Sequence, residues 1–146
     1  MPITHHSRLV AAACRQIEAS DELPELSELA ERAGLSPWHF HRVFKAVTGV
    51  TPRSYASARR AEKVREQLHQ GKSVTETLYA SGFNSSGRFY EAANGMLGMA
   101  PAAFRQGGSN ASIHFALAQC SLGAVLVACS ERGVCAILLG DEPQAL

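Results

Sequence analysis

Residues 26–52, LSELAERAGLSPWHFHRVFKAVTGVTP, decide the fold of this chain. Their apolar residues recur at helical spacing in two short runs, which are separated by a turn of three residues, 34–36. Gly34 can take the left-handed conformation that ends a helix, and Ser36 followed by Pro37 is typical of a helix cap and first turn. Two helices joined by a short turn that contains glycine form a helix-turn-helix unit. The second helix is expected to end at Gly49 and to turn inward Phe40, Val43, Phe44 and Val47.

A second copy of this unit lies at residues 74–101, VTETLYASGFNSSGRFYEAANGMLGMAP. The copy has one extra residue in its turn. Its Gly82 and Gly98 align with Gly34 and Gly49, and Phe89 aligns with Phe40. The sequence SVTE at 73–76 is a capping box, which predicts a helix start at this point. The chain therefore contains one supersecondary unit twice.

The segment between the two copies is expected to be one long helix that begins at Thr51-Pro52 and runs to about Gln70. Its inward residues are expected to be Tyr55, Ala58, Ala61, Val64 and Leu68, with five basic residues on the outward side. A helix rises ~1.5 Å per residue, so this spacer would hold the two units about 25 to 30 Å apart. Because the major groove repeats every ~34 Å, a monomer of this kind is expected to reach two successive grooves of slightly bent DNA.

The outer face of the helix that begins at Pro37 carries Trp38, His41, Arg42 and Lys45 at helical spacing. Arginine can donate two hydrogen bonds to guanine, tryptophan offers apolar contact to thymine methyl groups, and lysine supplies charge to phosphates. This face therefore suits the major groove of DNA. The structural alternative is that Trp38 packs against the next helix. His39 and His41 are two residues apart and point in different directions on a helix, so no metal site is expected there.

Charge is segregated along the chain although its net value is only +1. Residues 18–31 carry six acidic side chains and no basic one, whereas residues 36–65 carry seven basic side chains against Glu62 alone. A polyanion is a suitable partner for the basic segment. The alternative is a solvated helix face, or a helix bundle that uses its basic helix to bind an acidic protein partner.

Length and composition indicate a globular protein rather than a disordered one, since 46% of the 146 residues are hydrophobic and 18% are charged. The longest apolar run, 134–139, is far too short to span a bilayer, and we expect a cytoplasmic protein. No pair of the four cysteines forms a C-x-x-C motif, so we expect reduced, mostly buried thiols, with no metal and no cofactor.

The pattern changes from helical to extended after residues 107–112, which form a linker by composition. Segments 113–118, 124–129 and 134–139 are rich in β-forming residues, and residues 130–133 are expected to form a hairpin turn. Three strands of this aliphatic content need a covering layer, and no further element follows them in the sequence. We expect an incomplete β-rich piece of a larger domain.

The two motifs AGLSPWHFHRVFKAVTGVTPRSY and ASGFNSSGRFYEAANGMLGMAPAAFR resemble the paired helix-turn-helix motifs of the AraC/XylS family of transcription regulators, over residues 4–106. The resemblance implies that double-stranded promoter DNA is bound, that RNA polymerase is a partner, and that the protein lies on the bacterial nucleoid when bound. It places the DNA-binding residues at Pro37, Trp38, His39, His41, Arg42, Lys45, Arg53, Ser85, Ser86, Gly87, Arg88 and Tyr90. Glu91 departs from the family, which often has a basic residue there, so the second motif is expected to bind DNA more weakly or to read it differently.

The segment IHFALAQCSLGAVLVACSERGVCAILLGDEPQAL resembles the start of the methyltransferase region in the Ada family of adaptive-response regulators, which are methylated-DNA–protein-cysteine methyltransferases. Together, the two resemblances imply a mainly α fold. It has two helix-turn-helix units joined by a long helix, about seven helices in all, and then a short incomplete β segment. The implied domains are the DNA-binding domain at 1–106, the linker at 107–112 and a partial methyltransferase domain of ribonuclease-H-like fold at 113–146.

Two functions remain open on these grounds. The first is an Ada-like transcription activator that binds DNA without doing chemistry. The alternative is a DNA repair enzyme in which a cysteine of this chain accepts the alkyl group. The cysteine-rich zinc segment and the Pro-Cys-His-Arg acceptor motif of the Ada family do not occur in these 146 residues. An acceptor thiolate needs a neighbouring base, and the cysteines of the β segments have no adjacent histidine. We therefore expect no catalytic residue.

Overall fold

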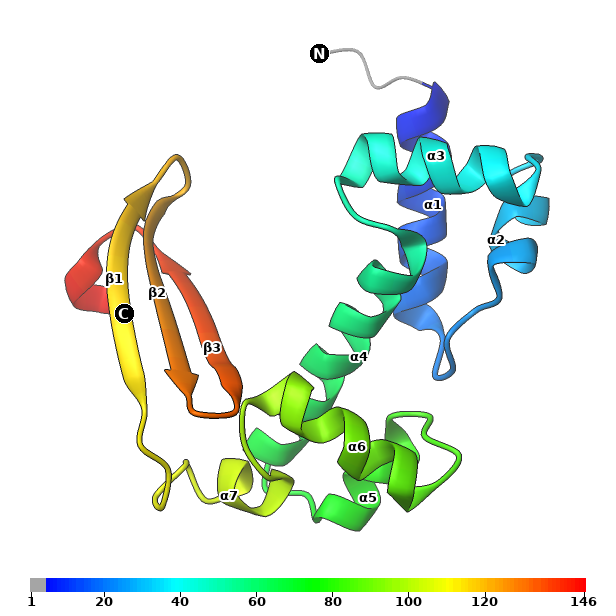
Figure 1. Ribbon diagram of the computed structural model, residues 1–146. Coiled ribbons are helices and arrows are strands. Elements are labelled where there is room, and N and C mark those ends of the chain that lie inside the picture. The colour runs from blue at the N-terminus through cyan, green and yellow to red at the C-terminus, as the bar shows by residue number, and fades with distance from the viewer. Residues whose placement is uncertain (1–4) are drawn as a thin grey trace. The chain divides into compact units, whose positions relative to one another are not determined.

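The computed structural model describes residues 5–146, whose contacts divide into two units that meet within one helix. The first unit, up to Lys63, holds α1 (His5–Ala19), α2 (Leu26–Arg32), α3 (Pro37–Thr48) and the first part of α4 (Pro52–His69). The second unit, from Val64, holds the end of α4 and the remaining elements (Figure 1). These are α5 (Val74–Ala80), α6 (Ser86–Leu97), α7 (Pro101–Arg105), β1 (His114–Cys120), β2 (Gly123–Ser130), β3 (Gly133–Gly140) and the 3-10 turn η1 (Pro143–Ala145).

The described residues confirm the expected fold class, with seven α-helices and a three-stranded antiparallel sheet near the C-terminus. Both helix-turn-helix units form where the repeat predicts them. Gly34 has φ 67° and Gly82 has φ 69°, the left-handed conformation that ends α2 and α5. None of the helices within residues 5–146 is long and apolar enough to cross a membrane.

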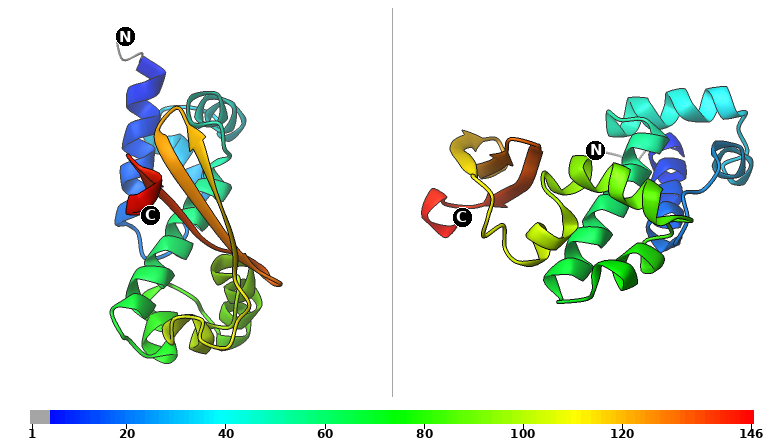
Figure 2. Two further views of the ribbon diagram at one scale, coloured as in Figure 1. Left: turned by 90° about the vertical axis from the view of Figure 1, so that its left-hand side faces the viewer. Right: turned by 60° about the horizontal axis from the view of Figure 1, so that its bottom comes forward.

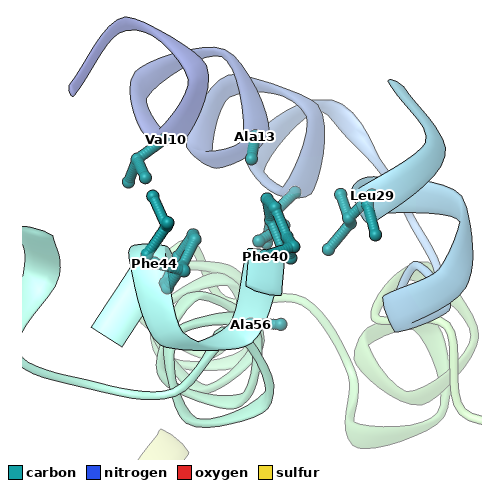
Figure 3. Packing of buried hydrophobic residues seen from close by; sticks show 9 residues of the cluster. Val10, Ala13, Leu29, Phe40, Phe44 and Ala56 are labelled. Carbon is teal, nitrogen blue, oxygen red and sulfur yellow. The ribbon is translucent and has the colours of Figure 1, made fainter. Parts of the chain in front are cut away.

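The first unit is built around a core to which all four of its helices contribute, as Figure 3 shows. Phe40 and Phe44 of α3 are 1% and 0% exposed, and they meet Val10 of α1 and Leu29 of α2. The aromatic ring of Phe44 lies edge-on to Tyr55 of α4, with the ring centroids 5.8 Å apart. This packing fixes α3 against its neighbours and leaves its opposite side for other contacts.

Two residues expected to face inward do not. Val47 is 44% exposed, because it lies in the last turn of α3, beyond the core that Phe40 and Phe44 fill. Ala58 is exposed and Ala56 is buried instead, so the inward stripe of α4 is displaced where it meets the first unit. Ala61 is buried as expected.

The second unit has its own core, which repeats the first at Phe89 of α6. Phe89 is fully buried among Val64 and Leu68 of α4 and Leu78 of α5. The predicted capping box at the start of α5 is confirmed, since Ser73 and Glu76 bond each other's backbone amides. The hydrogen bonds from Ser73 also lower the pKa of the Glu76 carboxyl, which keeps it charged at the positive end of the helix.

The three strands pair in the order β1-β2-β3, and the turn expected at 130–133 joins β2 to β3. Leu126 on the central strand pairs with Leu117 on one side and Leu138 on the other. Every residue of β1 is exposed, and Figure 2 shows the three strands from two further sides. Within the second unit, β3 packs against α6.

Candidate nucleic-acid interface

The position of α3 on the surface of the first unit follows from local sequence signals. The hydroxyl of Ser36 accepts a hydrogen bond from the backbone amide of His39 at 3.3 Å, and Pro37 occupies the first helical position. Gly49 closes the helix with φ 81°. The buried stripe then directs the opposite stripe of α3 into solvent.

Trp38 and Arg42 form the centre of this outer stripe. Trp38 is 69% exposed, so it does not pack against the next helix as the structural alternative required. The guanidinium carbon of Arg42 lies 4.6 Å from the centre of the Trp38 ring, which is a cation–π contact. Stacking restrains the arginine while its hydrogen-bond donors stay exposed. Lys45 extends the same stripe and is also exposed.

The two histidines of α3 lie on opposite flanks of this stripe. The ring of His39 lies edge-on to His6 of α1 at a centroid distance of 6.1 Å, beside a hollow of about 550 Å³ that Trp38 and Arg42 also line. His41 instead lines a second hollow of about 610 Å³ together with Arg53. The predicted residues of the first unit therefore form three neighbouring zones: one central stripe and two flanking hollows.

In the second unit, α6 presents the other predicted residues. The hydroxyl of Ser85 caps the helix by accepting a hydrogen bond from the backbone amide of Arg88 at 3.3 Å. Ser85 through Arg88 are all exposed, and Tyr90 is 52% exposed. Glu91 is exposed on the same face, so this face carries a negative charge where α3 carries the charge of Arg42.

The outward basic face predicted for α4 is confirmed in part, since Arg53 and Arg59 are exposed, but ion pairs engage some of its cations. Lys63 donates to Asp21 at 2.5 Å, which lowers the pKa of that carboxyl. Arg59 contacts Glu18 at 3.7 Å and Glu62 at 2.5 Å. The acidic block of residues 18–22 therefore offsets much of the positive charge of α4.

Arg65 also departs from that prediction, because it is partly buried and donates to the carbonyl of Met96. A helix engaged in this way is a poor site for an acidic protein partner. Arg42 and Lys45 of α3 and Arg88 of α6 remain exposed.

Only one cysteine side chain is buried, which corrects the expectation of mostly buried thiols. Cys135 is buried, Cys14 and Cys129 are half-buried, and Cys120 is exposed at the end of β1. All four thiols are free. Within residues 5–146 no three His, Cys, Asp or Glu side chains are grouped closely enough to hold a metal ion.

The sequence analysis missed two residues that lie beside α3 and α6. His6 lies next to His39, and Arg132 of the β2–β3 turn donates to Asn94 of α6 at 3.4 Å. Neither lies in a helix-turn-helix motif, and no local pattern marks either of them. The opposed acidic and basic blocks at 18–31 and 36–65 were a signal from which the ion pairs of α4 could have been found.

Comparison with known proteins adds a family to this geometry. The family described as a helix-turn-helix domain matches residues 29–107. The chain is 45% identical over 142 residues to the Bifunctional transcriptional activator/DNA repair enzyme Ada of Escherichia coli K12, covering 97% of this chain and 40% of that protein. It is 44% identical to the Regulatory protein ada of Salmonella typhimurium, covering 94% of this chain and 38% of that one. The chain thus spans about two fifths of the length of these relatives.

Two solved structures share the helical fold. One is the C-terminal domain of AraT, a response regulator from Geobacillus stearothermophilus, with a TM-score of 0.64 and 21% identity over 73% of this chain and 88% of that one. The other is an AraC-type transcriptional regulator from Chromobacterium violaceum, with a TM-score of 0.61 and 25% identity over 70% of this chain and 93% of that one.

Proposed function

The chain belongs to the AraC-type helix-turn-helix family of DNA-binding transcription regulators, and from this premise we propose that α3 and α6 read successive major grooves of one duplex. The observation that carries the proposal is the outer stripe of α3, where Arg42 lies over an exposed Trp38. A large aromatic side chain in solvent, stacked under a guanidinium, has no packing role in the first unit. On DNA, the tryptophan ring can contact thymine methyl groups and the guanidinium can donate hydrogen bonds to guanine.

The protein acts in this proposal as a monomeric activator of an Ada-like response to alkylation damage, with RNA polymerase as its partner at the promoter. The relatives named for Ada support this role. The two-fold repeat within one chain supports binding as a monomer, because it supplies both recognition helices. The protein would then work on the bacterial nucleoid in the cytoplasm.

Selection of duplexes from a random pool by the purified protein tests the proposal most directly. We expect the selected sequences to share two conserved blocks about one helical turn apart. Affinity for the selected duplex should fall steeply with salt, because Lys and Arg contacts release counterions from the phosphates. Failure to enrich any sequence at low salt would show that the chain does not read DNA.

Arg42→Ala is expected to weaken binding to the selected duplex by about 1 to 3 kcal/mol and to relax the preference at one base position. The reason is that a bidentate contact to guanine is lost while the fold is untouched. Binding to the selected duplex and to single-base variants of it measures both effects. Lys45→Ala is the matched control, since it removes a charge from the same stripe and should weaken all sequences alike. An equal loss on all sequences for Arg42→Ala would make Arg42 a phosphate contact.

For the cysteines we propose that none of the four accepts an alkyl group from DNA. Cys135 is buried with its sulfur 3.9 Å from the carbonyl oxygen of Gly98, a contact that suits packing rather than nucleophilic attack. After incubation with a duplex that contains O6-methylguanine, the mass of the intact chain should be unchanged. The gain of one methyl group on any cysteine would identify an acceptor and favour the repair enzyme.

A further inference from the structure

The β2–β3 turn lies against the last turn of the second recognition helix. Figures 1 and 2 show the turn beside α6, and two hydrogen bonds join it to the helix and its C-cap, while a third lies within the turn. The hydroxyl of Ser130 donates to the carbonyl of Gly98 and accepts from the backbone amide of Arg132. The guanidinium of Arg132 donates to the side-chain oxygen of Asn94 at 3.4 Å.

Gly98 makes this close approach possible. A Cβ atom at Gly98 would lie 2.7 Å from the carbonyl oxygens of Gly133 and Val134, closer than real contacts allow. Gly98 also has φ 65°, as the end of α6 requires. Gly98 therefore both ends α6 and allows the β2–β3 turn to pack against that end.

The internal repeat shows what Arg132 replaces. The alignment that places Phe89 on Phe40 places Asn94 on Lys45 and Glu91 on Arg42. The outer stripe of α3 thus ends in a lysine, whereas the same position of α6 holds a neutral amide. The side-chain oxygen of Asn94 accepts a hydrogen bond from the guanidinium of Arg132. The cation at this position therefore comes from the β2–β3 turn, whereas in the first unit it is Lys45 on the helix itself.

We propose that Arg132 is a DNA phosphate contact of the second unit, which makes the β2–β3 turn part of the DNA interface. The inference rests on the proposed function, because it takes α6 as a recognition helix. Such a helix puts its N-terminal residues on the base edges. A helix of 12 residues is about 18 Å long, whereas the major groove is about 12 Å wide. The last turn of α6, with Arg132 beside it, then lies at the phosphate backbone that borders the groove.

Glu131 offsets the charge of Arg132, so the turn has no net charge. Contact with a phosphate therefore depends on where the guanidinium is held and not on the total charge of the turn. Arginine suits this role, because it is always charged and binds phosphate through two parallel donors. A phosphate contact positions the protein without reading sequence. The contact of Arg132 should therefore strengthen the binding of all duplexes by the same factor.

Arg132→Gln tests the proposal in the full chain. With the selected duplex and with an unrelated duplex of the same length, we expect the affinity to fall about 3- to 10-fold on both. The slope of log affinity against log salt should become shallower by about one, as expected for one lost phosphate contact. Arg132→Lys should keep the salt slope, because it keeps the charge.

Arg15→Gln is the matched control, because Arg15 is an exposed cation on α1, outside both helix-turn-helix motifs. It should leave both affinities and the salt slope unchanged. If Arg132→Gln binds both duplexes with the affinity and slope of the wild type, the inference is overturned while the proposed function stands. A loss confined to the selected duplex would also overturn it, since Arg132 would then read a base. If the wild type binds no duplex, the proposed function itself fails.

Discussion

Phe40→Ala is expected to abolish sequence-specific DNA binding, whereas Phe89→Ala should leave recognition of the first half-site in place. Both phenylalanines are at most 1% exposed, and removing such a ring costs about 3 to 5 kcal/mol. A unit of this size has only a few kcal/mol of stability to lose, so either substitution should unfold the unit that contains it. The contacts of the chain fall into two units, so the other core keeps its own contacts.

The difference between the two variants arises from the chemistry of the recognition helices. The outer stripe of α3 carries Trp38 and Arg42, whereas that of α6 carries Tyr90 and Glu91. Specific binding should therefore depend mainly on the first unit. Binding of each variant to the selected duplex and to its two halves measures this difference, and circular dichroism reports how much helix is lost.

Phe115→Ala is the control for the loss of an aromatic ring, since Phe115 is 66% exposed on β1. It should change neither stability nor binding. If Phe40→Ala and Phe89→Ala weakened the first half-site equally, the assignment of specificity to the first unit would be wrong.

The sequence predicted the helices and their ends well, because each of these depends on residues close together in the chain. Ser36 and Ser73 cap helices three residues before the amides that they accept from, and Gly34 ends α2 through its own backbone conformation. The exposure of Trp38 also follows from helical pitch, once Phe40 and Phe44 are assigned to the core. Features of this kind can be found without knowledge of the rest of the fold.

Contacts between distant segments account for what the sequence did not predict. Lys63 and Asp21 are 42 residues apart, and Arg132 and Asn94 are 38 apart. Helical periodicity gives the side of α4 that faces solvent but not which acidic side chains approach it. The sequence pattern likewise identified the three strands, but nothing in it indicated that their turn would meet α6.

The last prediction concerns α4, the helix that connects the two units. Ala61→Pro is expected to weaken binding of the complete selected duplex far more than binding of a duplex that carries only the first half-site. Ala61 is buried in the interior of α4, where proline removes a backbone donor, clashes with the preceding turn and costs ~3 kcal/mol or more.

Linked binding explains why the losses should differ. When the spacer helix is continuous, binding of the first unit raises the effective concentration of the second at its groove, and this advantage depends on geometry. Ala61 lies near the end of the first unit but in neither hydrophobic core, so a break there removes the fixed spacing while the core around Phe40, which the first half-site needs, keeps its contacts. Pro52 at the start of α4 shows that proline is tolerated at a first helical turn, so the effect belongs to the interior position.

Ala58→Ser is the matched control, because Ala58 is exposed on the same helix and the substitution keeps the backbone donor. It should bind both duplexes nearly as well as the wild type. Titration of each variant with the complete duplex and with the half-site duplex, at one salt concentration, gives the ratio that decides the question. An equal loss on both duplexes for Ala61→Pro would mean that the second unit does not touch DNA, and α6 would then be a surface for packing or for another protein.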